Sequence, residues 1–199
     1  FRKSVLEGLR QPLEEKCVRI VRGHGAYVFP ADFMLVAAMN PCPCGQYGTG
    51  DCRCTPNQIH RYLNRISGPL LDRIDLEVEM GAVAYEEMTA ETNEESSQTV
   101  KQRVDLARQR QLARYEGQKI YCNAQLDSRL TKAHCKLDTE GETVLRHAFD
   151  NLSLSARAYG RILKVARTIA DLDGSENILV QHVAEAVQYR SLDRKYWGN

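Results

Sequence analysis

The sequence lacks several features that would place it at once in a broad class of proteins. Its net charge is only +1 across 199 residues, so no overall positive field draws it onto nucleic acid, although local basic patches are allowed. It contains no apolar run long enough to span a bilayer and no secretory signal segment, which argues against a membrane or secreted protein. It also contains no Gly-x4-Gly-Lys-Ser/Thr loop and no acidic magnesium-binding strand motif, so we expect it to bind and hydrolyse ATP poorly by itself.

What is present is an ordinary globular composition, with 43% hydrophobic and 27% charged residues, long enough for one good core or two small ones. The seven cysteines do not indicate a secreted disulfide scaffold, which is usually smaller and richer in cysteine. We therefore expect a reducing compartment, the cytoplasm. Because the chain begins with Phe1 and not with Met, we also expect that it is a piece of a longer protein.

Four of the cysteines lie in one loop as two Cys-x-Cys pairs: Cys42, Cys44, Cys52 and Cys54. Glycines between the pairs let the loop fold back on itself. Four thiolates can enclose one tetrahedral Zn²⁺ as a closed structural site. Because Cys-x-Cys is tighter than the common Cys-x2-Cys spacing, free thiols and disulfides are the alternatives. No open coordination position is implied, so the sequence predicts a structural metal and no catalytic one.

A near-continuous apolar run from Phe33 to Met39 ends abruptly at Asn40 and Pro41. A short apolar run closed by proline is typical of a strand that is buried on both faces. Asn40 would then lie at the C-terminal tip of a central strand, the edge at which open α/β sheets bind ligands. The alternative is a plain polar cap at a strand end.

Local patterns predict the elements before this run. Residues 1–9 indicate the end of a helix that Pro12 stops. Two β-rich runs, 17–22 and 26–29, flank Gly23-His24-Gly25 and therefore predict a β-hairpin.

After the cysteine loop, Thr55, Pro56 and Gln58 form a capping-box start for a helix that ends before Gly68. Residues 74–80 then alternate between apolar and acidic side chains, which predicts a half-exposed strand. The apolar members of this strand would face inward: Ile74, Leu76, Val78 and Met80.

Residues 85–98 are acidic, rich in Thr, Ser and Glu, and without an apolar period, so we expect a linker or mobile loop. A long basic helix is predicted over about 99–115, with charges that form a solvated face or, alternatively, contact nucleic-acid phosphates. Its inward face would contain Val100, Val104, Ala107 and Leu112. The remaining part predicts a small bundle of three helices: 139–152 after Asp138, 156–172 between Ser155 and Gly174, and 180–190.

Taken together, these segments resemble one family. The strings FMLVAAMNPCPCG, CRCTP and SGPLLDRIDLEVE, with VLEGLRQPLEE before them and LSARAYGRILKVARTIADL and HVAEAVQYRSLDR after them, are similar to magnesium-chelatase-like AAA+ ATPases of the ComM/YifB type. The resemblance implies an α/β fold, with the second half of an AAA+ P-loop-type core (a sheet with an inserted hairpin) in 1–85. An acidic linker and basic helix would occupy 86–119, and an all-α helical lid 120–199. The P-loop region would precede Phe1.

The resemblance also implies roles for residues that would meet ATP and Mg²⁺ in the full-length protein. Asn40 has the position of the first sensor, whose amide reaches the γ-phosphate and the attacking water. Arg73 has the position of an arginine finger that enters the neighbouring subunit's nucleotide; the alternative is a surface ion pair with an adjacent aspartate. Arg157 matches the second sensor at the start of a lid helix, where N–H groups favour phosphate, and Arg161 is the second choice. Arg167 is expected to be structural.

By resemblance, the full-length protein would form a ring, hexameric, that couples ATP hydrolysis to DNA processing in recombination or natural transformation, as a branch-migration-type helicase does. One alternative is a magnesium chelatase ATPase subunit, against which the cysteine loop argues. The other is a non-enzymatic, zinc-containing module that binds nucleic acid without any ATPase segment.

In AAA+ sheets the strand that carries the first sensor lies between two strands from upstream sequence. We therefore expect 33–39 to pair with upstream residues of the intact protein or with another copy of the chain, because unpaired backbone groups are costly. The hairpin before it would project toward a central pore, unless it is merely structural. Residues from about 120 to 199 should be well ordered in either case.

Overall fold

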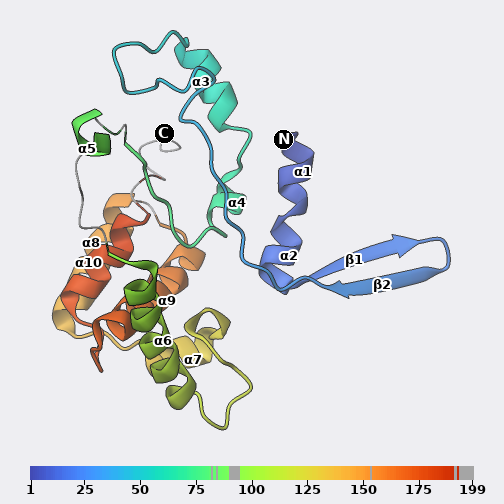
Figure 1. Ribbon diagram of the computed structural model, residues 1–199. Helices are drawn as coiled ribbons and strands as arrows, with labels where there is room; N and C mark the ends of the chain where they lie inside the picture. The colour runs from blue at the N-terminus through green and yellow to red at the C-terminus, as the bar shows by residue number, and fades with distance from the viewer. Residues whose placement is uncertain (82, 84, 90–94, 153, 191, 193–199) are drawn as a thin grey trace. The chain divides into compact units, whose positions relative to one another are not determined.

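The computed structural model describes residues 1–199 apart from 82, 84, 90–94, 153, 191 and 193–199, and apart from the side chains of 86 and 87. Its described residues form two compact units, unit 1 over 1–74 and unit 2 over 75–192. The elements of unit 1 are, in chain order, α1 (Lys3–Gly8), α2 (Arg10–Glu15), β1 (Cys17–Arg22), β2 (Gly25–Pro30), α3 (Pro56–Leu63) and α4 (Gly68–Leu71) (Figure 1).

The predicted hairpin is confirmed, as an antiparallel pair of β1 and β2 that aligns Cys17 with Pro30 and Arg22 with Gly25. Gly23 in the turn has φ +51°, a left-handed conformation that glycine adopts without steric cost. Lys16 also has a positive φ, 54°, and turns the chain from α2 into β1. From the third residue of β1 onward almost every side chain of the ribbon is exposed, on both of its faces.

The prediction that Pro12 stops the first helix is wrong. The chain forms two short helices, and Pro12 is the third residue of the second one, α2, where it is buried. The backbone N–H groups in the first turn of a helix have no acceptor within the helix, so a proline there removes no hydrogen bond. The break between α1 and α2 instead falls at Leu9.

The predicted buried strand over 33–39 is not formed. The segment has no regular secondary structure, and the exposed fractions of Met34 and Val36 are 87% and 82%. A strand is stabilised by hydrogen bonds to its neighbours, and the described residues supply no strand beside this run, since β1 pairs with β2. The AAA+ core expected for the first half of the chain is therefore not formed by these residues alone.

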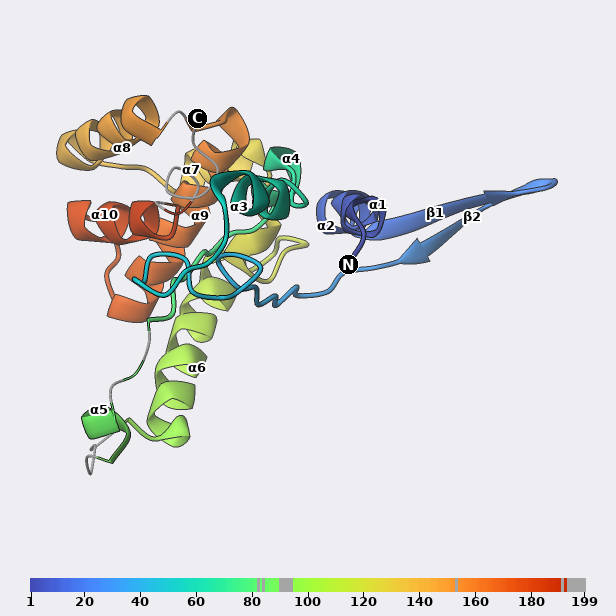
Figure 2. The same cartoon turned by 90° about the horizontal axis from the view of Figure 1, so that it is seen from above.

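Unit 2 is helical: its elements are α5 (Tyr85–Thr89), α6 (Ser97–Arg114), the 3₁₀ helix η1 (Asn123–Gln125), α7 (Ser128–His134), α8 (Thr139–Leu152), α9 (Ala156–Asp173) and α10 (Val180–Gln188). α9 packs against α6, α7 and α10, and α10 also packs against α8 (Figures 1 and 2). Their core contains Leu145, Ile162, Ala166 and Val183. This bundle fits the helical lid that the resemblance implies. Among the described residues, none of the helices has both the length and the apolar character that a membrane crossing requires.

The predicted strand over 74–80 is also wrong: the segment has no regular secondary structure, and Leu76, Val78 and Met80 are exposed. Among its acidic residues only Glu77 is partly buried. The Glu77 amide donates to the Tyr189 carbonyl at 3.0 Å, and a Glu77 carboxylate oxygen lies 3.7 Å from Arg190 Nη1. The contacts of Glu77 with Arg190 and Tyr189 therefore hold this segment in unit 2, although the alternating sequence pattern predicts that its apolar side chains are buried.

Two expectations for the middle of the chain need correction. The short helix α5 lies inside the segment expected to be a linker, and on the predicted inward face of α6 only Ala107 is buried. Val100 and Val104 are exposed because α6 packs on the bundle mainly through its C-terminal half, while its first turns extend beyond the bundle (Figure 2). Leu112 lies in the packed half and is nevertheless 47% exposed.

Candidate functional site

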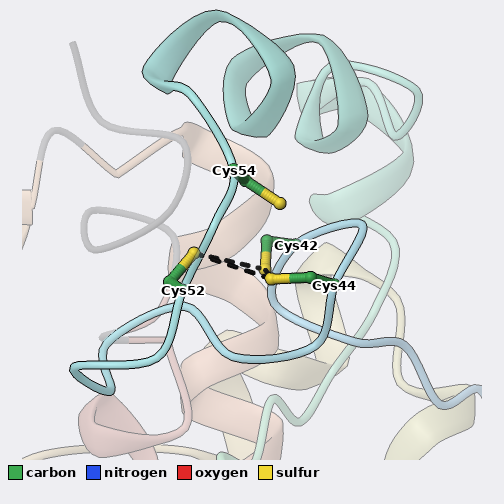
Figure 3. A group of neighbouring side chains, drawn as sticks. All are labelled: Cys42, Cys44, Cys52 and Cys54. Atoms are coloured by element: carbon green, nitrogen blue, oxygen red, sulfur yellow. Dashed lines mark hydrogen bonds between the residues drawn. The ribbon is translucent and has the colours of Figure 1, made fainter.

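Between β2 and α3 the chain forms the cysteine loop, residues 41–55. Its four cysteines come together in space, one pair from the first part of the loop and one pair from its end (Figure 3). All four Sγ atoms lie within 4.8 Å of one another, and the separations are 3.3 Å for Cys42–Cys44, 3.9 Å for Cys42–Cys52 and 3.7 Å for Cys44–Cys52. A tetrahedral zinc with Zn–S bonds of about 2.3 Å places its sulfur atoms about 3.8 Å apart. The cysteines are free, since a disulfide needs about 2.05 Å between sulfur atoms. The donor set and its spacing therefore fit a four-thiolate metal site.

Local chemistry explains how the loop reaches this shape. Gly45 and Gly48 have φ values of +80° and +90°, which allow the tight reversal between the two cysteine pairs. Thr55 directly follows Cys54 and caps α3: the Gln58 amide donates to Thr55 Oγ1, and the Thr55 amide donates to Gln58 Oε1. The predicted capping box is thus confirmed, and it fixes the end of the loop to the start of a helix.

The thiols of the cluster differ in acidity. Backbone hydrogen bonds at Gln46 and Arg53 lower the pKa of the Cys44 thiol to about 6, whereas burial raises the pKa of Cys54 to about 12. Cys44 therefore loses its proton readily, and the negative charge of its thiolate disfavours deprotonation of the neighbouring thiols. A bound divalent cation would remove that resistance, so metal binding would release protons from the other thiols.

Asn40 lies directly before this loop and is exposed. It does not end a strand, because the run before it is irregular. A Cβ placed at Gly45 would lie 3.7 Å from Asn40 Nδ2, so the Asn40 amide lies beside the turn of the cysteine loop.

Arg73 follows α4 and is only 8% exposed. Its Nη1 donates to the Pro69 carbonyl at 2.5 Å, and its Nη2 forms an ion pair with Glu14 of α2. The surface ion pair considered from the sequence does not describe this arginine, because its guanidinium is buried. Both contacts hold Arg73 inside unit 1.

Arg157 and Arg161 lie one turn apart at the start of α9, where the predicted cap Ser155 accepts a hydrogen bond from the Ala158 amide at 3.1 Å. The Arg157 side chain is exposed. Arg161 is less exposed and its Nη1 forms an ion pair with Asp75. Neighbouring arginines on the first two turns of a helix are well placed to bind an anion, because the free N–H groups and the helix dipole add to their charge.

Arg167 is structural, as expected. It is buried on α9 and donates to the carbonyls of Ser175 and Glu176, both at 2.7 Å.

Sequence reasoning missed the carboxylates that hold the candidate arginines, Glu14 for Arg73 and Asp75 for Arg161. The sequence does indicate that Asp75 could pair with an arginine, because it is an acidic residue two positions after Arg73. Its partner could not be found from spacing, since Arg161 is 86 residues further along the chain.

Comparison with known proteins shows which family the chain belongs to. The family described as magnesium chelatase, subunit ChlI, matches residues 1–88, and the family of the C-terminal region of that subunit matches residues 94–190. An uncharacterized protein of Escherichia coli, YifB, is 46% identical over 199 residues, covering 98% of this chain and 38% of its own length.

The competence protein ComM of Haemophilus influenzae is 45% identical over 196 residues, again 98% of this chain and 38% of the relative. An uncharacterized protein of Mycobacterium tuberculosis is 39% identical over 187 residues, 94% of this chain and 37% of the relative. The chain thus spans less than two fifths of the length of these relatives. Since the similarity extends through the cysteine loop, α4 and the lid helices, the chain belongs to the magnesium chelatase family, among its ComM- and YifB-like members.

Proposed function

We propose that this chain is the C-terminal part of an AAA+ ATPase that works as a ring, hexameric by resemblance, and couples ATP hydrolysis to DNA processing. The observation that carries the proposal is the 45% identity to the competence protein ComM across 98% of the chain. Recombination during natural transformation, with branch migration of DNA, is the process we expect it to serve. We expect it in the cytoplasm, where cysteines stay reduced.

In this proposal ATP and Mg²⁺ are bound mainly by segments outside this chain, which supplies three groups to the nucleotide. Asn40 orients the attacking water, Arg157 with Arg161 binds phosphate oxygens, and Arg73 acts on the nucleotide of a neighbouring subunit. A guanidinium there offsets the charge that develops on the γ-phosphoryl group in the transition state. Because Arg73 is paired with Glu14 in the structure, it would exchange this carboxylate for a phosphate when the ring assembles.

We further propose that Cys42, Cys44, Cys52 and Cys54 hold a structural zinc ion. The support is the near-tetrahedral spacing of the Sγ atoms. The zinc would fix the loop next to Asn40 and the start of α3 and would take no part in the chemistry.

The experiment is ATP turnover by the full-length protein, with and without branched DNA. Turnover should rise with DNA, and Arg73→Ala should abolish turnover while leaving nucleotide binding largely intact, since a finger acts on transition-state charge. Mixing this variant with a P-loop-deficient subunit should restore some turnover at interfaces where intact halves meet. Lost nucleotide binding without rescue would instead mean that Arg73 only maintains the fold.

The second candidate function is insertion of Mg²⁺ into a porphyrin, and the family description of the matching profiles favours it. ATP turnover by the full-length protein that depends on a porphyrin and ignores DNA would establish this function in place of DNA processing.

A further inference from the structure

An open groove of about 690 Å³ lies in unit 1 along α3, with Lys3 of α1 at its border. Its lining comes from two segments that are far apart in the sequence: Lys3 from α1, and Asn57, His60, Arg61, Asn64 and Arg65 from α3 and the residues just after it. Every one of these side chains can donate a hydrogen bond, and none is a carboxylate.

The positive charge in this groove is offset only in part within the described residues, where Glu7 acts on Lys3 electrostatically. Lys3, Arg61 and Arg65 form no ion pair there, and α3 contains no acidic residue. The one carboxylate of α1, Glu7, is engaged by Arg10 at 2.8 Å and by Ser67 at 2.5 Å. An ordinary solvated helix face mixes both signs of charge, so this groove differs from one.

The groove is also built on fixed elements. Residues 57, 60, 61, 64 and 65 recur every three or four positions, so they share one face of α3, while Leu63 is buried on the other side. The Arg65 guanidinium lies over the Tyr62 ring, with 5.8 Å to the ring centroid, which restricts its motion. The capping box at Thr55 fixes the beginning of the helix.

We propose that this groove binds the phosphate backbone of nucleic acid. Arg61 lies in the last turn of α3 and Arg65 two residues after its end, so the two cations follow each other closely along the chain, as phosphates do along one strand. Lys3 adds a third cation from across the groove, and Asn57 and Asn64 can donate to phosphate or sugar oxygens. Because the cations of the lining attract phosphates whatever the base, most of the binding should be independent of sequence. The inference rests on the proposed work on DNA and locates one DNA-binding surface on the subunit.

The test measures binding of a fluorescent single-stranded oligonucleotide, and of a duplex of the same sequence, to the full-length protein by anisotropy across a range of salt. Lys3→Gln, Arg61→Gln and Arg65→Gln are combined in one variant. At moderate salt its affinity should fall at least about tenfold, and the slope of log Kd against log salt should fall by about 2, since each phosphate contact contributes about 0.7–0.9. The matched control combines Arg129→Gln, Lys132→Gln and Arg146→Gln, three exposed cations of unit 2 with the same loss of charge, and should keep the wild-type slope.

The possible outcomes separate the two proposals. A wild-type slope in the groove variant overturns the groove assignment and leaves the DNA function standing, whereas a full-length protein that binds no DNA overturns both. Loss of ATP affinity with unchanged DNA binding would assign the groove to a nucleotide and would also overturn the proposal. If the triple variant unfolds by circular dichroism, Arg61→Gln and Lys3→Gln are measured singly, and each should lower the slope by about 0.7–0.9.

Discussion

Asp171 of α9 has no exposed surface and holds together the polar interior of unit 2. It accepts hydrogen bonds from Arg114 Nη1 and Asn123 Nδ2, both at 2.9 Å, and pairs with Arg167 at 3.2 Å. Tyr115 donates to Asn123 Oδ1 at 2.6 Å and extends the network. The buried guanidinium of Arg167 and the partly buried one of Arg114 therefore share one carboxylate for compensation, so this residue should dominate the stability of the lid.

Asp171→Asn should lower the free energy of unfolding by about 3 kcal/mol, because it leaves one buried and one partly buried cation without their negative partner. Urea unfolding followed by circular dichroism measures the change. Asp150→Asn is the matched control, since Asp150 is exposed on α8, and should change stability by less than about 0.5 kcal/mol. Equal effects from the two substitutions would show that the network contributes nothing special.

Asp75 restrains Arg161, which is a proposed phosphate ligand. The Asp75 carboxylate and an ATP phosphate would compete for the Arg161 guanidinium. Asp75→Asn should therefore raise the ATP affinity of the full-length protein by up to about fivefold, which corresponds to the free energy of a partly exposed ion pair. Adding Arg161→Ala should cancel the gain. Asp32→Asn, which breaks the exposed pair with Lys16, serves as the control. Lower ATP affinity in Asp75→Asn would mean that the pair positions Arg161 for the nucleotide instead of withholding it.

At the scale of single residues, the sequence was most informative where a side chain acts on its own neighbours. The caps Thr55, Asp138 and Ser155 all act within three residues and were predicted correctly. The partners of Arg73 and Arg161 lie 59 and 86 residues away, and no local pattern encodes them.

Among the helices, two glycines of α9 illustrate how one chemical change can have opposite effects. Gly174 ends the helix with φ +78°, and an added Cβ would lie 3.1 Å from Arg110 Nη2. Gly160 lies inside the same helix, has no such φ, and has no atom within 4 Å of an added Cβ. The backbone conformation at the helix end therefore requires glycine, and the one in the middle does not.

Gly174→Ala should destabilise the chain by about 1 kcal/mol, because alanine is strained in the left-handed conformation. Gly160→Ala should stabilise it by about 0.5–1 kcal/mol through helix propensity and a more restricted unfolded chain. Thermal melting of both variants provides the comparison. Two shifts of the same sign would contradict the assignment of these two conformations.

The cysteine loop should lose its shape without a metal. Purified protein should contain about one zinc per chain by elemental analysis, and Cys42→Ser with Cys52→Ser should remove it, since two of four ligands are lost. Cys122→Ser, outside the cluster, is the control and should retain the zinc. Metal-free protein that folds normally, with all four loop thiols reacting freely with a thiol reagent, would contradict the site.

Two predicted strands, 33–39 and 74–80, are among the elements that the sequence predicted incorrectly. The helices of unit 2 bury their apolar faces against one another, so their periodicity was sufficient to locate them. A strand needs a neighbouring strand to complete its hydrogen bonds. The apolar run at 33–39 indicates that the segment is suited to burial in a sheet, but it does not show which strand would pair with it. At 74–80 the alternation was clear, but contacts with Arg190 and Tyr189 determined which side chains turn inward.

At the scale of the whole molecule, the exposed run 33–39 predicts a difference between this chain and the full-length protein. Its amides should exchange hydrogen rapidly in the 199-residue chain and slowly in the full-length protein, where further strands would pair with it. Hydrogen exchange followed by mass spectrometry measures both. The amides of α9 serve as the internal control and should be protected in each. A monomeric 199-residue chain with strong protection at 33–39 would weaken the AAA+ assignment of the first half.

The β1–β2 ribbon presents Tyr27, Val28 and Phe29 to solvent, with exposed fractions of 58%, 57% and 52%. A two-stranded ribbon without a third strand or a covering helix is only marginally stable and opens readily. In the ring proposed above, other subunits would cover this ribbon, so proteases that cut after aromatic residues would find cleavage sites mainly on unassembled copies. On that proposal, the amount of the protein would follow the amount of completed assembly.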